Sequence, residues 1–252
     1  MAGFLYPLVG MAALFVVWWL GGAIVAADPD LNAFSDFAPV PAIDALFHLV
    51  ASGKIWPQAL ASLSRIGQGL AIAVLIGVPV GIAIGRSRSF ARITHVPFQF
   101  LRMISPLAWM PIAVMAFATW DGAIIFLIAA AAVWPIAFAT ANGLRKLHPN
   151  WHKVARNLGA GPARMLWRIT LPAVAQDILT GIRLAVGIAW IILVPAEYLG
   201  VTSGLGYAIN DARDTLRYDN LAAIVLFIGI LGFAMDSCCL AVIRRYAWHP
   251  EN

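Results

Sequence analysis

Two acidic residues, Glu197 and Asp236, fall within long apolar stretches of the sequence. Acidic side chains at membrane depth are rare and are functional candidates by default, for example as carriers of a coupling ion. A structural role explains them as well, because Glu197 is near the end of its stretch and can reach water. Asp236 is close enough to Arg244 and Arg245 for an ion pair. The two carboxylates leave open a secondary carrier that is driven by an ion gradient.

Residue patterns that indicate an enzyme are missing. The sequence has no G-x-x-x-x-G-K-[ST] motif and is not expected to bind ATP through a P-loop. Ser203 would need a histidine base within reach, and the five histidines fall outside the interiors of the apolar stretches. His148 and His152 have a metal-compatible spacing, but Pro149 separates them and no cysteine or carboxylate joins them in the loop. We therefore expect no catalytic residue, metal site or cofactor in this chain.

The composition indicates a membrane protein. Hydrophobic residues make up 62% of the 252 residues and charged residues 12%, whereas soluble domains carry about 25% charge. Only helices and closed barrels satisfy the backbone in lipid, and the apolar runs are continuous rather than alternating, which favours helices. A net charge of +5 would suit nucleic acid, but the basic residues gather on one side of the membrane. We predict an all-α membrane protein with no nucleic-acid partner.

Six transmembrane helices are predicted, because each span needs roughly 20 apolar residues. They cover residues 4–25, 57–85, 93–120, 123–144, 174–199 and 221–243. A short amphipathic helix is expected at residues 41–52 and a polar loop at residues 200–220. Ser105, Pro106 and Pro111 interrupt the third span, where proline kinks a helix. Gly77, Gly81 and Gly85 share one face of the second span and favour close helix packing.

The basic residues are distributed unevenly between the loops. The loops after the second, fourth and sixth spans hold most of the lysines and arginines, and the opposite loops hold only Lys54, Arg213 and Arg217. The positive-inside rule therefore places both termini and the loop at residues 145–172 in the cytoplasm. Arg102 lies deeper in the chain's apolar part and is predicted to face a partner or a pore.

Residues 150–173 form the longest polar interruption of the apolar sequence. We predict a short helix, a turn and the start of a second helix there. Four basic residues surround a centre that contains glycine and proline: Lys153, Arg156, Arg164, Arg168, Gly159, Gly161 and Pro162. Anionic lipid headgroups would explain the arginines but not the spacing described next.

The spacing in this segment resembles the EAA-x3-G-x9-I-x-LP signature of bacterial ABC-importer permeases. Lys153 stands where the signature has Glu, and Val154 occupies the second position. Other segments, among them AEYLGVTSGLGYAINDAR, look like the nitrate, sulfonate, taurine and bicarbonate branch of these permeases, so the resemblance runs from about Trp56 to the C-terminus. The positions that correspond to the signature by spacing are Lys153, Val154, Ala155, Gly159, Ile169, Leu171 and Pro172, and the first two differ from it in residue type.

The resemblance implies a type I ABC-importer permease fold in the bacterial inner membrane. Residues 1–55 would hold the first transmembrane helix and a periplasmic segment, residues 56–243 the core, and residues 244–252 a cytoplasmic tail. The expected partners are a second permease subunit, either an identical copy in a homodimer or a paralogue, two cytoplasmic ATPase subunits that bind ATP and Mg²⁺, and a periplasmic or lipid-anchored binding protein. The expected solute is small and anionic, of the sulfonate, taurine, nitrate or bicarbonate type.

In this family the signature segment forms a coupling helix that docks into a groove on the ATPase. The resemblance assigns this docking to Lys153, Val154, Ala155, Arg156, Asn157, Leu158, Gly159, Ala160, Gly161 and Pro162. Ile169, Leu171 and Pro172 would transmit the movement to the fifth span. For the translocation pathway we assign the third and fifth spans, although packing explains the same residues equally well. The pathway candidates are Ser105, Pro106, Trp109, Met110 and Glu197.

Overall fold

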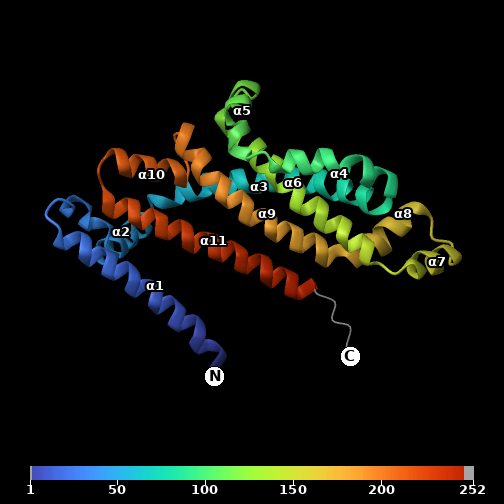
Figure 1. The fold of residues 1–252 in the computed structure, drawn as a ribbon, viewed down its shortest axis with the longest axis horizontal. Coiled ribbons are helices and arrows are strands. Elements are labelled where there is room, and N and C mark those ends of the chain that lie inside the picture. Colours follow the sequence, from blue (N-terminus) through green and yellow to red (C-terminus); the bar gives the residue numbers. More distant parts are fainter. Residues whose placement is uncertain (1, 247–252) are drawn as a thin grey trace. The chain divides into compact units, whose positions relative to one another are not determined.

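The structure, a computed structural model, describes the backbone of residues 2–246, and every regular element in that part of the chain is a helix (Figure 1). The prediction of an all-α protein is therefore confirmed. Most of the predicted cytoplasmic tail, residues 247–252, lies outside the described residues. The helices are α1 (Ala2–Ala27), η1 (Asn32–Phe37), α2 (Pro39–Ala51), α3 (Ile55–Arg86), α4 (Arg88–Met103), η2 (Pro106–Trp109), α5 (Met110–Ala116), α6 (Trp120–Lys146), α7 (Pro149–Asn157), α8 (Pro162–Met165), the π-helical η3 (Leu166–Thr170), α9 (Leu171–Gly200), α10 (Leu205–Asp214) and α11 (Tyr218–Tyr246).

The chain divides into two compact units. The first unit comprises Met1–Ser62 and Glu197–Leu231, and the second comprises Leu63–Ala196 and Gly232–Asn252. The elements α1, α2 and α10 belong to the first unit, and α4 to α8 belong to the second. The long helices α3, α9 and α11 contribute residues to both units.

Five helical stretches in the described residues are long and apolar enough to cross a membrane. They correspond to the first, second, fourth, fifth and sixth predicted spans. The stretch that corresponds to the fifth predicted span is longer than expected, because α8 and η3 continue into α9 without a break. The predicted amphipathic helix at residues 41–52 is confirmed as α2. The five stretches are Tyr6–Ala27, Ile55–Arg86, Trp120–Lys146, Pro162–Gly200 and Tyr218–Arg245.

The third predicted span, residues 93–120, is interrupted at the predicted prolines, and more sharply than by a kink. The helix α4 and the following stretch Pro106–Ala116 are bent by 84° with respect to each other, as a broken span or a re-entrant loop would be. Proline has no backbone N–H and pushes the residue before it out of the helical region. Ser105 accordingly has a ψ of 126°, and the hydrogen-bond ladder stops at Ile104. The prolines do more than kink this segment, since they divide it.

The predicted polar loop at residues 200–220 is also corrected, because it contains the helix α10. Leu205 and Ala212, seven residues apart, are both buried, so the segment has the one-sided apolar pattern of an amphipathic helix. Its many charged residues conceal this pattern in the sequence. The helix begins after Gly204, whose φ of +107° is a conformation that glycine adopts easily.

The first unit gathers aromatic side chains around the end of α1. Trp18 Nε1 donates to the backbone oxygen of Phe37 at 3.0 Å. The ring of Tyr218 lies 5.2 Å from the ring of Phe34 and 5.1 Å from that of Phe37. The apolar stretch of α1 is otherwise unburied within the chain. Lipid or another chain is therefore needed to cover it.

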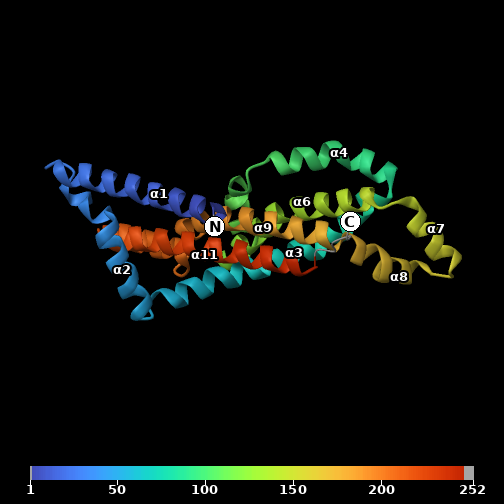
Figure 2. The ribbon, with the colours of Figure 1, turned by 90° about the horizontal axis from the view of Figure 1, so that it is seen from below.

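The second unit is built around the packing of α3 on α6. The prediction that Gly77, Gly81 and Gly85 permit close packing is confirmed, since a Cβ at each would lie 2.4–3.0 Å from its nearest atom on α6. At Gly81 that atom is the backbone oxygen of Ala137, which cannot move without moving its helix. On the other side of α6, α4 runs alongside (Figure 2), with the Phe98 and Trp134 ring centroids 5.2 Å apart.

The substitution Gly81→Ala is expected to destabilise the second unit by about 1–3 kcal/mol, the range for overpacked sites. The added methyl would overlap the Ala137 oxygen and the Thr140 Cβ, which lie 2.4 and 2.6 Å from its position. The matched control is Gly67→Ala, because Gly67 is on the same helix and a Cβ there would have nothing within 4 Å. Thermal unfolding in detergent measures both variants. Equal melting temperatures for the two variants would contradict the packing described.

Candidate functional site

The helix α7 ends in a glycine turn that redirects the chain. Gly159 has a φ of +75°. Its N–H donates to the Arg156 oxygen at 3.0 Å, and the Ala160 N–H donates to the Ala155 oxygen at 3.0 Å. These two bonds are the 5→2 and 6→1 pair of a Schellman cap, which places glycine one position after the C-cap residue, here Leu158. The predicted helix, turn and second helical start are confirmed.

The second helix of this segment is continuous with the long helix α9. It begins at Pro162 and continues to Gly200. Residues Leu166–Thr170 are π-helical, and the Leu171 N–H donates to the Leu166 oxygen five residues earlier. A π segment shifts the hydrogen-bond register, and the missing N–H of Pro172 falls immediately after it. Ile169 and Leu171 therefore lie where the short polar helix joins the apolar one.

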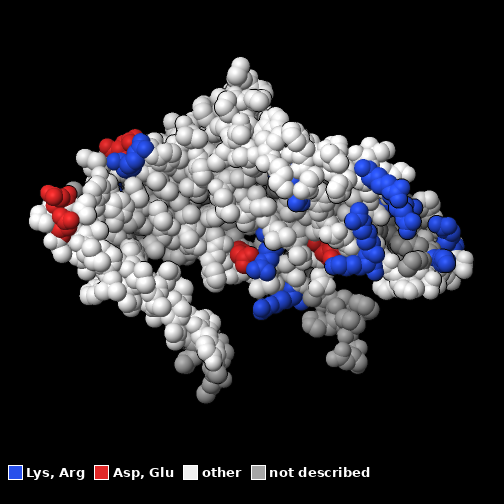
Figure 3. All heavy atoms as spheres, viewed as in Figure 1, with Lys and Arg blue, Asp and Glu red and all other residues white. Residues whose placement is uncertain are grey.

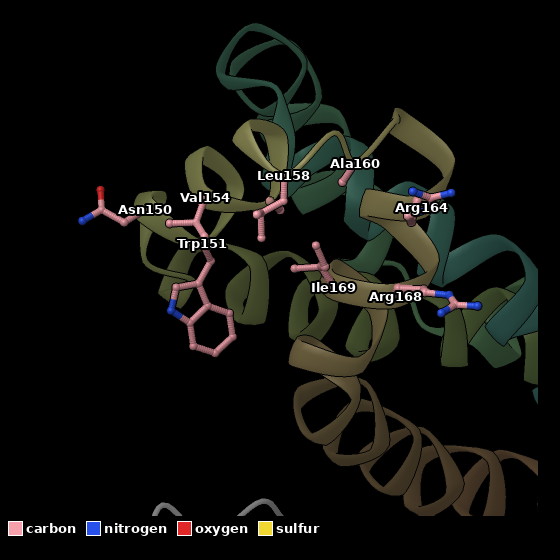
Figure 4. Close-up of a pocket in the computed structure, with 9 residues that line it drawn as sticks. Asn150, Trp151, Val154, Leu158, Ala160, Arg164, Arg168 and Ile169 are labelled. Atoms are coloured by element: carbon pink, nitrogen blue, oxygen red, sulfur yellow. The ribbon is translucent and has the colours of Figure 1, made fainter.

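A cavity of about 540 Å³ opens between α7 and the α8–η3 segment (Figure 4). Trp151 and Val154 of α7, together with its C-cap residue Leu158, face Ile169 of η3 across it. Ala155 is buried beneath. The exposed fraction is 57% for Val154 and 81% for Leu158, which is high for apolar side chains. We call this surface the loop cavity. Its full lining is Asn150, Trp151, Val154, Ala155, Leu158, Ala160, Arg164, Arg168 and Ile169.

Basic side chains surround the loop cavity. Lysines and arginines gather over α7 and α8 in the space-filling view (Figure 3). Arg164 and Arg168 contribute directly to its lining. An apolar hollow with a cationic rim has the character of a protein interface, where apolar anchors supply affinity and rim charges steer association.

The pathway candidates occupy different environments. Ser105 is exposed at the break after α4, whereas Met110 is buried. Pro106 and Trp109 line a second cavity, of about 520 Å³, between the α4–η2 segment and the helices α6 and α9. The structure thus brings Pro106 and Trp109 together on one cavity wall and leaves Met110 in the packing.

Comparison with known proteins settles the family. A family model described as the inner membrane component of binding-protein-dependent transport systems matches residues 73–247. The chain belongs to this family. The permease is therefore a membrane subunit of an ABC importer and not itself an enzyme. Such a system implies a separate ATPase and a binding protein.

Relatives of the permease are named for the transport of bicarbonate, taurine and nitrate. It is 36% identical to the bicarbonate transport system permease protein CmpB of Synechococcus elongatus, over 93% of its own length and 86% of that protein. It is 32% identical to the taurine transport system permease protein TauC of Escherichia coli, over 96% of its own length and 88% of that protein. It is 30% identical to the nitrate import permease protein NrtB of Synechocystis sp., over 91% of its own length and 84% of that protein.

A solved structure shares the fold of the permease. A chain of the inward-facing MetNI methionine ABC transporter superposes with a TM-score of 0.61 at 16% identity. The match covers 77% of the permease and 94% of that chain. At this identity the likeness supports the helical fold alone.

Glu197 is wholly buried in the first unit rather than open to water. Its carboxylate accepts from Ser62 Oγ at 2.8 and 2.9 Å and from the Gly206 N–H at 3.0 Å. Ser62 Oγ also accepts from the Leu205 N–H at 2.9 Å. The first N–H groups of a helix have no partner within the helix, and a negative charge is favourable there. Glu197 and Ser62 therefore cap α10, and the geometry favours a structural role for Glu197.

Asp236 has a different partner from the one that the sequence suggests. Its two carboxylate oxygens accept from Arg183 Nε and Nη2 of α9, both at 2.7 Å, and not from Arg244 or Arg245. A planar guanidinium matches a carboxylate bidentately, and this match requires the two side chains to face each other across helices. Both residues of this α9–α11 pair are satisfied, which leaves Asp236 as a structural link in the second unit.

Some residues of these arrangements could not be found from their spacing. Ser62 and Gln58 lie one turn apart on α3, and Gln58 Oε1 accepts from the Gly204 N–H at 2.6 Å. Neither residue is unusual at its position in the sequence. The only signal is the glycine content around Gly204, which indicates a special backbone conformation.

Proposed function

We propose that the permease imports a small oxyanion and that the segment of residues 153–162 docks onto the ATPase subunit. The exposed apolar loop cavity supports this docking more directly than any other observation. Val154 and Leu158 are apolar side chains on a basic loop, and lipid headgroups would attract the arginines without requiring either of them. A groove on a protein partner would bury both.

The proposed docking residues have different roles. Val154, Leu158 and Ala160 present apolar surface, while Gly159 and Gly161 shape the turn into α8. Ala155 is buried and supports the segment from within. Lys153, Arg156 and Asn157 are exposed and form the polar rim. Pro162 begins α8 with a φ that suits the first helical position.

Transmission of movement is assigned to Ile169, Leu171 and Pro172. The stretch Pro162–Gly200 is a single helical rod, so a displacement of α8 is carried into the apolar part of α9. Helices bend where the hydrogen-bond register changes, and η3 is such a point in this helical stretch. Ile169 lines the loop cavity and so connects the docking surface to that point.

The proposed assembly contains two copies of the permease, two ATPase subunits and one binding protein. The unburied apolar stretch of α1 is available for lipid or the second permease copy. Both termini and the loop cavity are placed in the cytoplasm, because the basic residues concentrate in the loops after the second, fourth and sixth spans. ATP and Mg²⁺ would bind to the ATPase subunits.

The proposed solute is a small oxyanion such as bicarbonate, nitrate or a sulfonate. This choice rests on the transport functions named for the three relatives above. The test reconstitutes the permease with its ATPase and binding protein in proteoliposomes. Uptake of labelled bicarbonate, nitrate and taurine is then measured with and without ATP on the side of the membrane that carries the ATPase.

ATP-dependent uptake of one of these solutes, unaffected by ionophores, is the expected result. A secondary carrier would behave in the opposite way. Uptake that survives the removal of ATP and collapses with the ion gradient would overturn the proposed function.

A further inference from the structure

Two neighbouring cavities of the second unit share three residues, Arg102, Phe138 and Asn142. The larger cavity, of about 520 Å³, is the one that Pro106 and Trp109 line. The smaller, of about 200 Å³, continues between α4 and α6 toward Arg145. We call the shared region the Arg102 site. The volume of the larger cavity falls in the range of small-molecule sites, which is about 300–1,000 Å³.

The Arg102 site is cationic. Its two cavities are lined by Arg102, Arg145 and His95, and no carboxylate is among the lining residues described. The guanidinium of Arg102 lies 5.4 Å from the centroid of the Phe138 ring, which holds it in place by a cation–π contact. An aromatic face does not use the hydrogen-bond donors of a guanidinium.

The position of Arg102 contrasts with that of other arginines in the apolar helices. Arg65 forms an ion pair with Asp121, and Arg183 forms one with Asp236. In the part of the chain that the structure describes, no carboxylate pairs with Arg102. Phe138 lies eight residues before the end of α6 at Lys146, or about 12 Å along the helix at ~1.5 Å per residue. A charge at this depth is costly unless it has a function or a partner.

We propose that the Arg102 site binds the transported oxyanion on its way through the membrane. The inference rests on the proposed function and adds the residues that would receive the anion. The planar guanidinium offers paired N–H donors that match two oxygens of a carboxylate, nitrate or sulfonate group. Asn142, which lines both cavities, supplies an amide N–H₂ group as a further donor. Arg145 extends the positive field toward the end of α6.

The experiment uses the reconstituted complex and whichever of labelled bicarbonate, nitrate or taurine the wild type transports. Arg102→Gln removes the positive charge, and Arg102→Lys keeps it. Asn142→Asp places a negative charge in the same cavities without altering Arg102. The matched control is Arg92→Gln, which removes a charge from α4 outside both cavities. Uptake and ATPase rate are measured in parallel for each variant.

Arg102→Gln and Asn142→Asp are each expected to lower anion uptake roughly tenfold or more, because a hydrogen bond to a charged group is strong. Their ATPase rates are expected to stay near that of the wild type. Arg102→Lys should retain a large part of the uptake, and Arg92→Gln nearly all of it. Loss of uptake with a normal ATPase rate separates anion binding from a merely structural role.

Wild-type uptake by the Arg102→Gln complex would overturn the inference. If the Arg102→Gln variant does not assemble, uptake by the Asn142→Asp complex tests the inference in its place. If Arg102 has only a structural role, the aspartate introduced by Asn142→Asp would give it an ion-pair partner, and uptake by this variant would remain normal. Normal uptake by Asn142→Asp would therefore also overturn the inference. Failure of the wild type to transport any of the three anions would instead refute the proposed solute class.

Discussion

Replacing Gly159 with valine is expected to reduce ATP-driven uptake about tenfold while the permease remains folded in the membrane. Gly159 has a φ of +75°, which costs a residue with a side chain roughly 1–2 kcal/mol and a β-branched residue more. A difference of one or two kcal/mol changes a population by a factor of about 5–30. The space around Gly159 is open, so the effect comes from the backbone and not from a clash. The Schellman cap would open, and α7 would no longer face Ile169.

Two further variants make this prediction specific. Gly67 of α3 lies outside the docking segment, has open space around it and has no positive φ, so Gly67→Ala should transport normally. Asparagine tolerates positive φ better than other side chains, so Gly159→Asn should retain more uptake than Gly159→Val. Uptake in proteoliposomes and binding of the ATPase subunit are the measurements. Equal uptake by the valine and asparagine variants would show that the turn conformation does not matter.

The second large effect is expected at Glu197. Removing its carboxylate by Glu197→Ala should lower the stability of the first unit by about 3 kcal/mol, in the range measured for buried charged networks that lose one partner. The Ser62 hydroxyl and the Gly206 N–H would both lose a buried acceptor. Protease sensitivity of α10 and thermal unfolding in detergent report this loss. Asp214→Ala, at the exposed end of α10, is the matched control.

Glutamine at position 197 separates the structural role from a pathway role. Glu197→Gln keeps the shape and one oxygen that can accept from Ser62 and Gly206, but it removes the negative charge that is favourable at the N-terminus of α10. The capping interpretation predicts that this variant melts earlier than the wild type. A variant that melts normally yet transports no solute would instead place Glu197 in the pathway.

The sequence is sufficient for the features that depend on composition and local spacing. Long apolar runs produce the spanning helices, and the glycines of α3 identify its packing face. The helix, turn and helix around Gly159 are predictable because glycine has a local reason to be there, namely its positive φ. The spacing from Gly159 to Pro172 indicates the family, which the family model confirms.

Features that depend on contacts distant in the sequence are not predictable in this way. Proximity along the chain favours Arg244 and Arg245 as partners of Asp236, whereas its partner Arg183 is 53 residues away. The capping of α10 by Ser62 joins residues 143 apart, so the polar stretch after Gly200 has the pattern of a loop. The break at Ser105 is visible in the sequence, but the 84° angle depends on how η2 and α5 pack on α6.

The π-helical segment η3 has a consequence for the direction in which the loop cavity faces. Successive residues of an α-helix are separated by about 100° around its axis. A π turn accommodates one more residue in the same number of turns, so α8 is rotated relative to the direction that an uninterrupted helix would give it. Deleting one residue between Leu166 and Thr170 would restore regular α-helical bonding and turn the cavity about 100° away. The nine residues between Gly159 and Ile169 therefore set the rotation of α8 about the helix axis as well as the distance from the glycine turn to η3.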